Sequence, residues 1–112
     1  MNFTDGQPIF IQIAERLSDE ILAGVYEADS RVPGVRDYSV LLGVNVNTTV
    51  KAYDLLAQRG VLYSKRGLGY FVAPEAQQLI LEVLKQELEA VRNRHKDTKQ
   101  KLKEFKEKYN GK

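Results

Sequence analysis

Apolar side chains recur at helical spacing near the start of the chain. Between residues 8 and 23 they occupy every third or fourth position, as Phe10, Ile13, Ala14, Leu17 and Ile21. This spacing predicts an amphipathic helix, with Pro8 suited to its first position and Gly24 to its end. A polar connection follows from Val25 to Arg31.

A second, shorter helix is predicted from about Gly34 to Gly43. Gly34 is an acceptable N-cap, and Asp37 places a negative charge in the first turn, where the positive end of the helix favours it. Gly43 lies between the apolar residues Leu42 and Val44. A glycine between two apolar anchors is typical of the turn that joins the two helices of a helix-turn-helix unit.

The third predicted helix begins after a cap at Asn45 and ends by Gly60. The residues that face inward by helical spacing are Thr49, Ala52, Tyr53 and Leu56. Another face, near the N-terminus of the helix, is small, polar or basic and consists of Asn47, Thr48 and Lys51. Such a face allows the backbone to come close to phosphates and short side chains to reach base edges in a groove of DNA.

Two short β-prone runs follow, at residues 61–63 and 70–72. We predict a hairpin with its turn at Lys65, Arg66 and Gly67, so that two exposed cations at the tip reach a neighbouring groove or phosphate. Three helices followed by a hairpin predict a winged helix-turn-helix, a mainly α fold with a small β-hairpin.

The remainder of the chain contains neither glycine nor proline between Pro74 and Gly111, which predicts a helical segment. Its apolar residues alternate in steps of three and four, as Leu81, Leu84, Leu88, Val91, Leu102, Phe105 and Tyr109. This is a heptad seam, interrupted by His95 and Thr98, and it implies a partner helix. We expect a DNA-binding domain at residues 1–73 and helices for dimerisation at residues 74–112, with the contact made by Leu84, Leu88, Val91, Leu102 and Phe105.

Composition narrows the function classes. The chain of 112 residues has no cysteine and a single histidine, His95, so we expect no metal site, no cofactor and no thiol nucleophile. Paired carboxylates and a nucleophile–base pair are also not evident, which argues against an enzyme. No apolar run approaches membrane-spanning length, and Gln12 and Glu15 break the first apolar cluster. We therefore expect a cytoplasmic protein without a signal peptide and without a membrane partner.

Charge is informative through its distribution, because the net charge is only +2. Residues 1–73 hold seven Lys/Arg against eight Asp/Glu, yet five of the seven cations fall between residues 36 and 66. Only Asp37 and Asp54 oppose them there. Positive charge is thus concentrated on the elements predicted to meet DNA.

An ordered set of motifs within residues 7–73 resembles the GntR-type bacterial transcriptional regulators, particularly the short YtrA-like subfamily. The motifs are Val32-Pro33-Gly34-Val35-Arg36, Gly43-Val44-Asn45-Val46-Asn47-Thr48, Ala52-Tyr53 and Arg66-Gly67-Leu68-Gly69-Tyr70-Phe71-Val72. The resemblance implies DNA contacts at Arg36, Asn45, Asn47, Thr48, Arg66 and Gly67. Lys51 and Lys65 join this set through their places on the third helix and in the hairpin.

The chain departs from the family pattern at several positions. Gly34 stands where the family usually has serine, and Val46 stands where the subfamily usually has proline. Thr49 replaces the usual valine, and Tyr38-Ser39 replaces the common Leu-Ala. For this reason the operator sequence of relatives does not carry over.

The resemblance implies that the tail is a pair of helices with a bend near His95 to Thr98, and we favour this arrangement over one long helix. The expected function is a homodimeric transcriptional regulator, a repressor, that binds a pseudo-palindromic operator in double-stranded DNA. A protein-interaction adaptor with a helical oligomerisation tail is the alternative. The cations Lys65 and Arg66 beside a polar helix opening favour DNA binding, and any effector ligand stays open.

Overall fold

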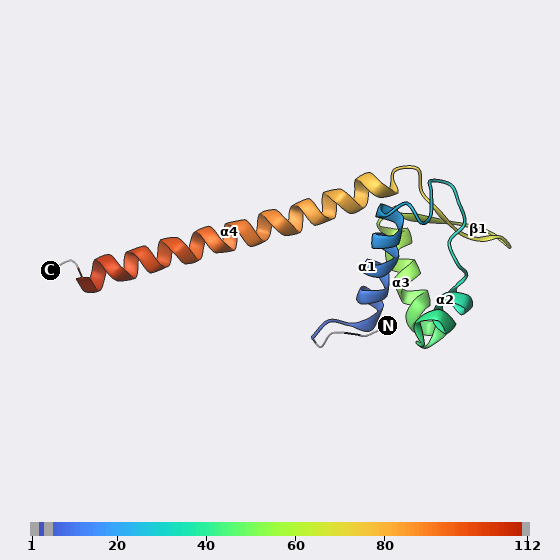
Figure 1. Cartoon of the computed structure of the whole chain (residues 1–112), viewed down its shortest axis with the longest axis horizontal. Coiled ribbons are helices and arrows are strands. Elements are labelled where there is room, and N and C mark those ends of the chain that lie inside the picture. The colour runs from blue at the N-terminus through green and yellow to red at the C-terminus, as the bar shows by residue number, and fades with distance from the viewer. Residues whose placement is uncertain (1–2, 4–5, 111–112) are drawn as a thin grey trace. The chain divides into compact units, whose positions relative to one another are not determined.

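The structure is a computed structural model that describes residue 3 and residues 6–110. Its elements are α1 (Ile9–Leu22), α2 (Val35–Leu42), α3 (Val46–Gln58), β1 (Leu62–Lys65), β2 (Gly69–Val72) and α4 (Ala76–Asn110) (Figure 1). The chain divides into two compact units, the first up to Ile80 and the second from Leu81 on. The predicted mainly helical fold with one small antiparallel hairpin is confirmed.

In the first unit, α1 and α2 both pack against α3, and α3 also contacts β1 (Figure 1). The predicted stripe of α1 is buried, except that Phe10 is only half-buried. The side chains predicted to face inward from α3 are buried as well. Six of the largest fully buried side chains close this core: Ile13, Leu17, Ile21, Tyr38, Tyr53 and Leu56. Their burial supplies the main favourable free energy for packing the three helices together.

Local signals end α2 and start α3 where the sequence predicts. Gly43 follows the last residue of α2 in the left-handed conformation, with φ +70°, which a side chain would oppose. Asn45 caps α3 with an extended backbone, and its side-chain oxygen accepts a hydrogen bond from the Asn47 N–H at 2.8 Å. The chain therefore turns from α2 into α3 within three residues.

Two departures from the family pattern meet each other in the core. The hydroxyl oxygens of Ser39 on α2 and Thr49 on α3 lie 2.7 Å apart in a hydrogen bond, and both residues are buried. A third departure, Tyr38, donates a hydrogen bond from its hydroxyl to Glu20 at 2.6 Å. Glu20 also pairs with Arg16 at 3.2 Å. The polar atoms that these residues bring into the core are thus paired with one another.

The hairpin is joined by a third extended segment that the sequence did not reveal. β1 and β2 pair in antiparallel register from Leu62↔Val72 to Lys65↔Gly69. On the other edge of β2, the connection before α2 pairs with it through the Val32 N–H to the Tyr70 carbonyl at 3.0 Å and the Val72 N–H to the Ser30 carbonyl at 2.9 Å. The hairpin of β1 and β2, which is the wing of the winged helix-turn-helix, is thereby joined by backbone hydrogen bonds to the segment that leads into α2.

The first five residues of α4, up to Ile80, belong to the first unit. Ala76 and Ile80 are buried in its core, and Leu79 packs close to Gly60 at the end of α3. The first unit therefore extends to Ile80, beyond the residue 73 at which we placed the boundary from the break at Pro74.

The expected bend in the tail is wrong, because α4 runs as one helix through residues 95–98. Within this continuous helix the Thr98 hydroxyl donates a hydrogen bond to the Arg94 carbonyl one turn earlier, at 2.9 Å. No glycine or proline interrupts this stretch, so nothing local breaks the backbone hydrogen bonds.

The predicted seam residues of α4 from Leu81 to Phe105 lie on the exposed surface of the helix, and the side chain of Tyr109 lies outside the described part. None of the helices in the described part of the chain combines the length and the apolar character that a membrane span requires.

Candidate nucleic-acid interface

The first turns of α3 present the polar residues that the sequence predicts for DNA contact. The side chains of Asn45, Asn47 and Lys51 are exposed, and Thr48 is half-buried. Because the opposite face of α3 is packed against α1 and α2, these residues are the part of the helix that an incoming ligand meets. The helix N-terminus adds a partial positive charge at the same place.

Arg36 lies exposed in the first turn of α2. Gly34, the N-cap of α2, has an extended backbone and no side-chain cap, as its lack of a hydroxyl implies. One residue earlier, the Pro33 carbonyl accepts a hydrogen bond from the Tyr53 hydroxyl of α3 at 2.6 Å. The segment that carries Arg36 is therefore fixed to α3.

At the wing, the structure separates the two predicted cations. Arg66 and Gly67 lie in the turn and are exposed, and the Leu68 N–H closes the turn on the Lys65 carbonyl at 2.9 Å. Lys65 itself is the last residue of β1, and its ammonium lies over the rings of Phe71, 4.6 Å from the centroid, and Tyr63, 5.8 Å away. The turn thus begins one residue later than predicted, and the Lys65 charge rests on its own hairpin through cation–π contacts.

Arg31 is a further basic residue at this surface that the sequence reasoning missed. Its guanidinium packs on the wing at Gly69, where an added Cβ would lie only 3.1 Å from the Arg31 Nε. Gly69 also has φ +109°, so this position favours glycine twice over. The sequence places Arg31 directly before the Val32-Pro33 motif, which is the one local indication of its role. Its contact with Gly69 could not be predicted, because Gly69 lies 38 residues further along the chain.

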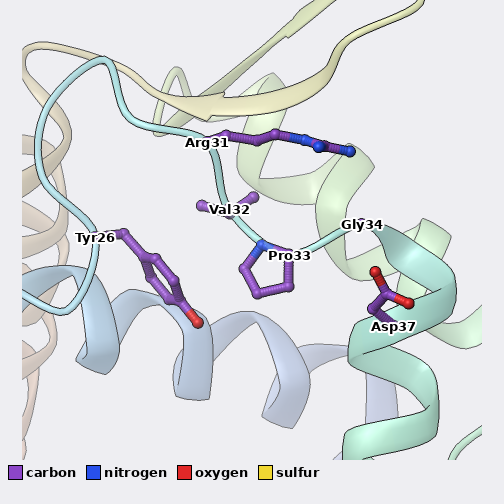
Figure 2. A pocket seen from close by; sticks show the side chains of 6 residues that line it. All are labelled: Tyr26, Arg31, Val32, Pro33, Gly34 and Asp37. Carbon is purple, nitrogen blue, oxygen red and sulfur yellow. The ribbon is translucent and has the colours of Figure 1, made fainter.

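A small pocket of about 210 Å³ lies beside this motif, lined by Tyr26, Arg31, Val32, Pro33, Gly34 and Asp37 (Figure 2). In Figure 2 the Arg31 side chain extends past Val32 and Pro33 toward the side where Gly34 lies, and Asp37 points in from α2. The volume is below the roughly 300 Å³ at which ordinary small-molecule sites begin. We assign it no ligand.

Three tyrosines link the elements of the interface. The Tyr53 ring lies 6.1 Å from that of Tyr38 on α2 and makes an edge-on contact, at 5.2 Å, with that of Tyr70 on the wing. Burial raises the pKa of the Tyr38 and Tyr53 phenols well above the ordinary value, so both remain protonated donors at neutral pH. The contacts connect α2, α3 and wing into one packed body.

The described residues contain no cluster of three or more histidine, cysteine or acidic side chains that is arranged to hold a metal ion. The residues predicted for DNA contact all belong to the first unit. Those predicted for dimerisation lie on α4 in the second unit.

Comparisons with known proteins agree with this architecture. The model of the family described as bacterial regulatory proteins, gntR family, matches residues 11–72. The chain therefore belongs to the GntR family, and the resemblance inferred from its motifs is confirmed.

Among curated relatives, the transcriptional repressor YtrA of Bacillus subtilis is 29% identical over 75 residues, which cover 67% of this chain and 58% of the repressor. Two longer regulators, from Escherichia coli and Rhizobium meliloti, match over only 14% and 13% of their lengths.

Among solved structures, a GntR family transcriptional regulator from Listeria monocytogenes has 30% sequence identity and a TM-score of 0.77, covering 86% of this chain and 87% of that one. The DNA-binding domain of AraR, solved in complex with an operator, has 31% identity and a TM-score of 0.60, covering 64% of this chain and 93% of that domain.

Proposed function

We propose that this chain is a transcriptional regulator that binds a specific double-stranded operator. The observation that carries the proposal is the exposed polar and basic face at the start of α3, held in one packed body with Arg36 and the wing. The winged fold that AraR uses on its operator DNA supports the same function.

In this proposal α3 enters the major groove with its N-terminal turns foremost. Asn47, Thr48 and Lys51 reach base edges or phosphates from its exposed face, and the Asn45 cap lies at the phosphate backbone. Arg36 contacts the DNA from the start of α2. Arg66 and Gly67 contact the flank from the tip of the wing, with Lys65 contributing charge from behind the tip.

The exposed seam of α4 supports the proposal of a homodimer. Leu84, Leu88 and Val91 are each about half exposed, and a helix with such a stripe is stabilised by burying it against another helix. Two copies joined in this way would present two α3 helices to a pseudo-palindromic operator, with half-sites about one helical turn apart. Leu102 and Phe105, which we expected in the same contact, lie further along the stripe beside a different set of charges.

Repression is the outcome we propose, since the relative YtrA is a repressor by name and a protein bound at a promoter obstructs transcription. The test begins with a footprint of the full chain on its own promoter region. The protected site then serves in affinity measurements over a range of salt concentrations.

Arg36→Ala should weaken binding to this site about fivefold to 150-fold, the loss expected for one base or phosphate contact of about 1–3 kcal/mol. Arg59→Ala is the matched control, because Arg59 is also exposed but lies at the opposite end of α3. Equal affinities for Arg36→Ala and the parent would overturn the assignment of Arg36. A chain that protects no DNA and shows no salt-dependent shift would favour the adaptor instead.

A further inference from the structure

The seam of α4 is a strict heptad repeat. Leu81, Leu88, His95 and Leu102 occupy positions a, while Leu84, Val91, Thr98 and Phe105 occupy positions d. We call the part from Leu81 to Val91 the proximal seam and the part from His95 to Phe105 the distal seam. In the distal seam the two large apolar side chains, Leu102 and Phe105, are 53% and 59% exposed. A repeat of 3.5 residues on a continuous helix is the pattern for left-handed pairing with another helix.

The charges beside the two parts of the seam differ. Beside the proximal seam, positions e and g hold one cation, Lys85, and one anion, Glu87. Beside the distal seam the e and g positions are all basic: Arg92, Arg94, Lys99, Lys101, Lys106 and Lys108. The acidic residues of this stretch occupy the outer positions c and f, where Gln100 donates a hydrogen bond to Glu104 at 3.2 Å.

The excess of positive charge beside the distal seam is large compared with the net charge of the whole chain. Residues 92–110 carry eight Lys/Arg against three Asp/Glu, a net charge of +5, whereas residues 1–91 carry eight against twelve, a net charge of −4. The excess of positive charge in this protein therefore lies along the distal seam.

A second copy of the chain suits the proximal seam better than the distal seam. In a parallel pair, each g position faces the following e position of the other helix. Glu87 then meets Arg92, which is favourable. The next two pairs join like charges, Arg94 with Lys99 and Lys101 with Lys106.

An antiparallel pair brings g to g and e to e. In the register that packs Leu81 of one helix against Phe105 of the other, Glu87 and Lys101 form the only facing pair of charged residues that attract each other. The remaining facing pairs of charged residues repel: Lys85 with Lys99, Arg92 with Arg92 and Arg94 with Arg94. In either orientation a second copy neutralises only one of the six flanking cations of each distal seam, Arg92 in the parallel pair or Lys101 in the antiparallel pair.

We propose that the distal seam docks an acidic amphipathic helix of another protein, one whose apolar stripe is flanked by carboxylates. Leu102 and Phe105 give the partner an apolar surface to cover, the flanking cations meet its carboxylates, and the polar positions His95 and Thr98 fix the register. The proximal seam remains with the second copy of the chain. This inference does not rest on the proposal of DNA binding.

Other polyanions fit these observations less well. A DNA backbone would neutralise the cations but would leave Leu102 and Phe105 exposed to water. An anionic membrane would cover those two side chains, but the polar His95 and Thr98 fall on the same stripe and would face the apolar interior. An acidic helix satisfies both the charge and the apolar seam.

The probe for the test is a synthetic 21-residue helix with leucine at a and d and glutamate at e and g, titrated against the full-length chain by fluorescence anisotropy. We expect the double variant K99E/K106E, which reverses two e positions, to weaken binding at least about tenfold. The matched control is K96E/K103E, which makes the same change of charge at the outer b positions and should stay within about twofold. Circular dichroism verifies that both variants keep α4 helical.

Equal losses from the two double variants, or no binding of the parent chain to the acidic helix, would overturn the proposal. A random DNA duplex and vesicles that contain phosphatidylserine serve as competing probes, and tighter binding to either, lost equally in both variants, also counts against it. Operator affinity is measured on the same proteins. Loss of the operator footprint with the acidic helix still bound would refute the proposed function alone.

Discussion

The hydrogen bond between Ser39 and Thr49 makes a sharp prediction about stability. Ser39 and Thr49 are 2% and 0% exposed, their hydroxyl oxygens lie 2.7 Å apart, and the Ser39 oxygen also lies 2.5 Å from the Val35 carbonyl oxygen. A carbonyl only accepts, so the Ser39 hydroxyl gives its single proton to Val35 and accepts a hydrogen bond from Thr49. The perturbation replaces the two residues by Ser39→Ala and Thr49→Val, singly and together.

The single and double substitutions should not add. Ser39→Ala deprives the buried Thr49 hydroxyl of its partner, which costs about 1–3 kcal/mol of the free energy of unfolding. Thr49→Val costs about 0.5–1.5 kcal/mol, because Ser39 retains the bond to the Val35 carbonyl. The double substitution replaces both hydroxyls by apolar groups of nearly the same shape, which is close to neutral. We therefore expect a coupling free energy of about 1.5–4.5 kcal/mol, the sum of the two single losses less a double loss near zero.

The assay is urea unfolding of the full chain at one fixed protein concentration, so that any contribution from dimerisation is the same in all four proteins. The chain has no tryptophan, and the near-ultraviolet circular dichroism of the buried Tyr38 and Tyr53 reports the packing of the first unit. Equal m-values would show that the unfolded states are comparable. Additive effects within about 0.5 kcal/mol would refute the coupling between the two hydroxyls.

Three further predictions concern the wing, the tail and the tyrosines. Arg66→Ala should reduce the log–log salt slope of operator binding by about one, while Lys65→Ala should reduce it less because the Lys65 ammonium lies over Phe71; binding measured at several salt concentrations compares the two. Removal of residues 81–112 should leave a folded monomer with operator affinity lowered by about two to four orders of magnitude, as sedimentation and anisotropy would show; a truncated chain that binds like the parent contradicts this. Burial raises the pKa of Tyr53 above 10.0, so the unfolded state loses the proton first and stability falls as the pH rises above about 10; urea unfolding in alkaline buffers, together with absorbance titration of the phenols, tests the sign.

The elements of the first unit were predictable because their signals are local. Gly43 and Asn45 act within one turn of where they stand, and the stripe on α1 needs no knowledge of its partner. The residues predicted to face inward from α3 follow from helical spacing in the same way. These signals place the helices and the exposed polar face of α3 without a structure.

The remaining features depend on contacts between segments far apart in sequence. Ser39 and Thr49 were each recognisable as departures from the family pattern, but only packing of α2 on α3 shows that they pair. Arg31 meets Gly69 because the connection before α2 pairs with β2. The bend near Thr98 was expected from the subfamily resemblance and from the polar interruption of the seam at His95 and Thr98, but the chain holds no residue there that interrupts a helix. We placed Lys65 in the turn because the sequence does not fix the register of the hairpin to within one residue. In the structure Lys65 is the last residue of β1 and pairs with Gly69.

The tyrosine contacts around Tyr53 have a consequence for how an operator is selected. The Tyr53 hydroxyl donates a hydrogen bond to the Pro33 carbonyl, and the Tyr53 ring makes an edge-to-face contact with the Tyr70 ring. Contacts within the protein therefore set the separation between α3 and the wing before DNA binds. A protein with a rigid span of this kind cannot adjust to a groove of the wrong width, so the duplex must deform instead. Base pairs that neither α3 nor the wing touches would then influence affinity through the stiffness of the DNA between them.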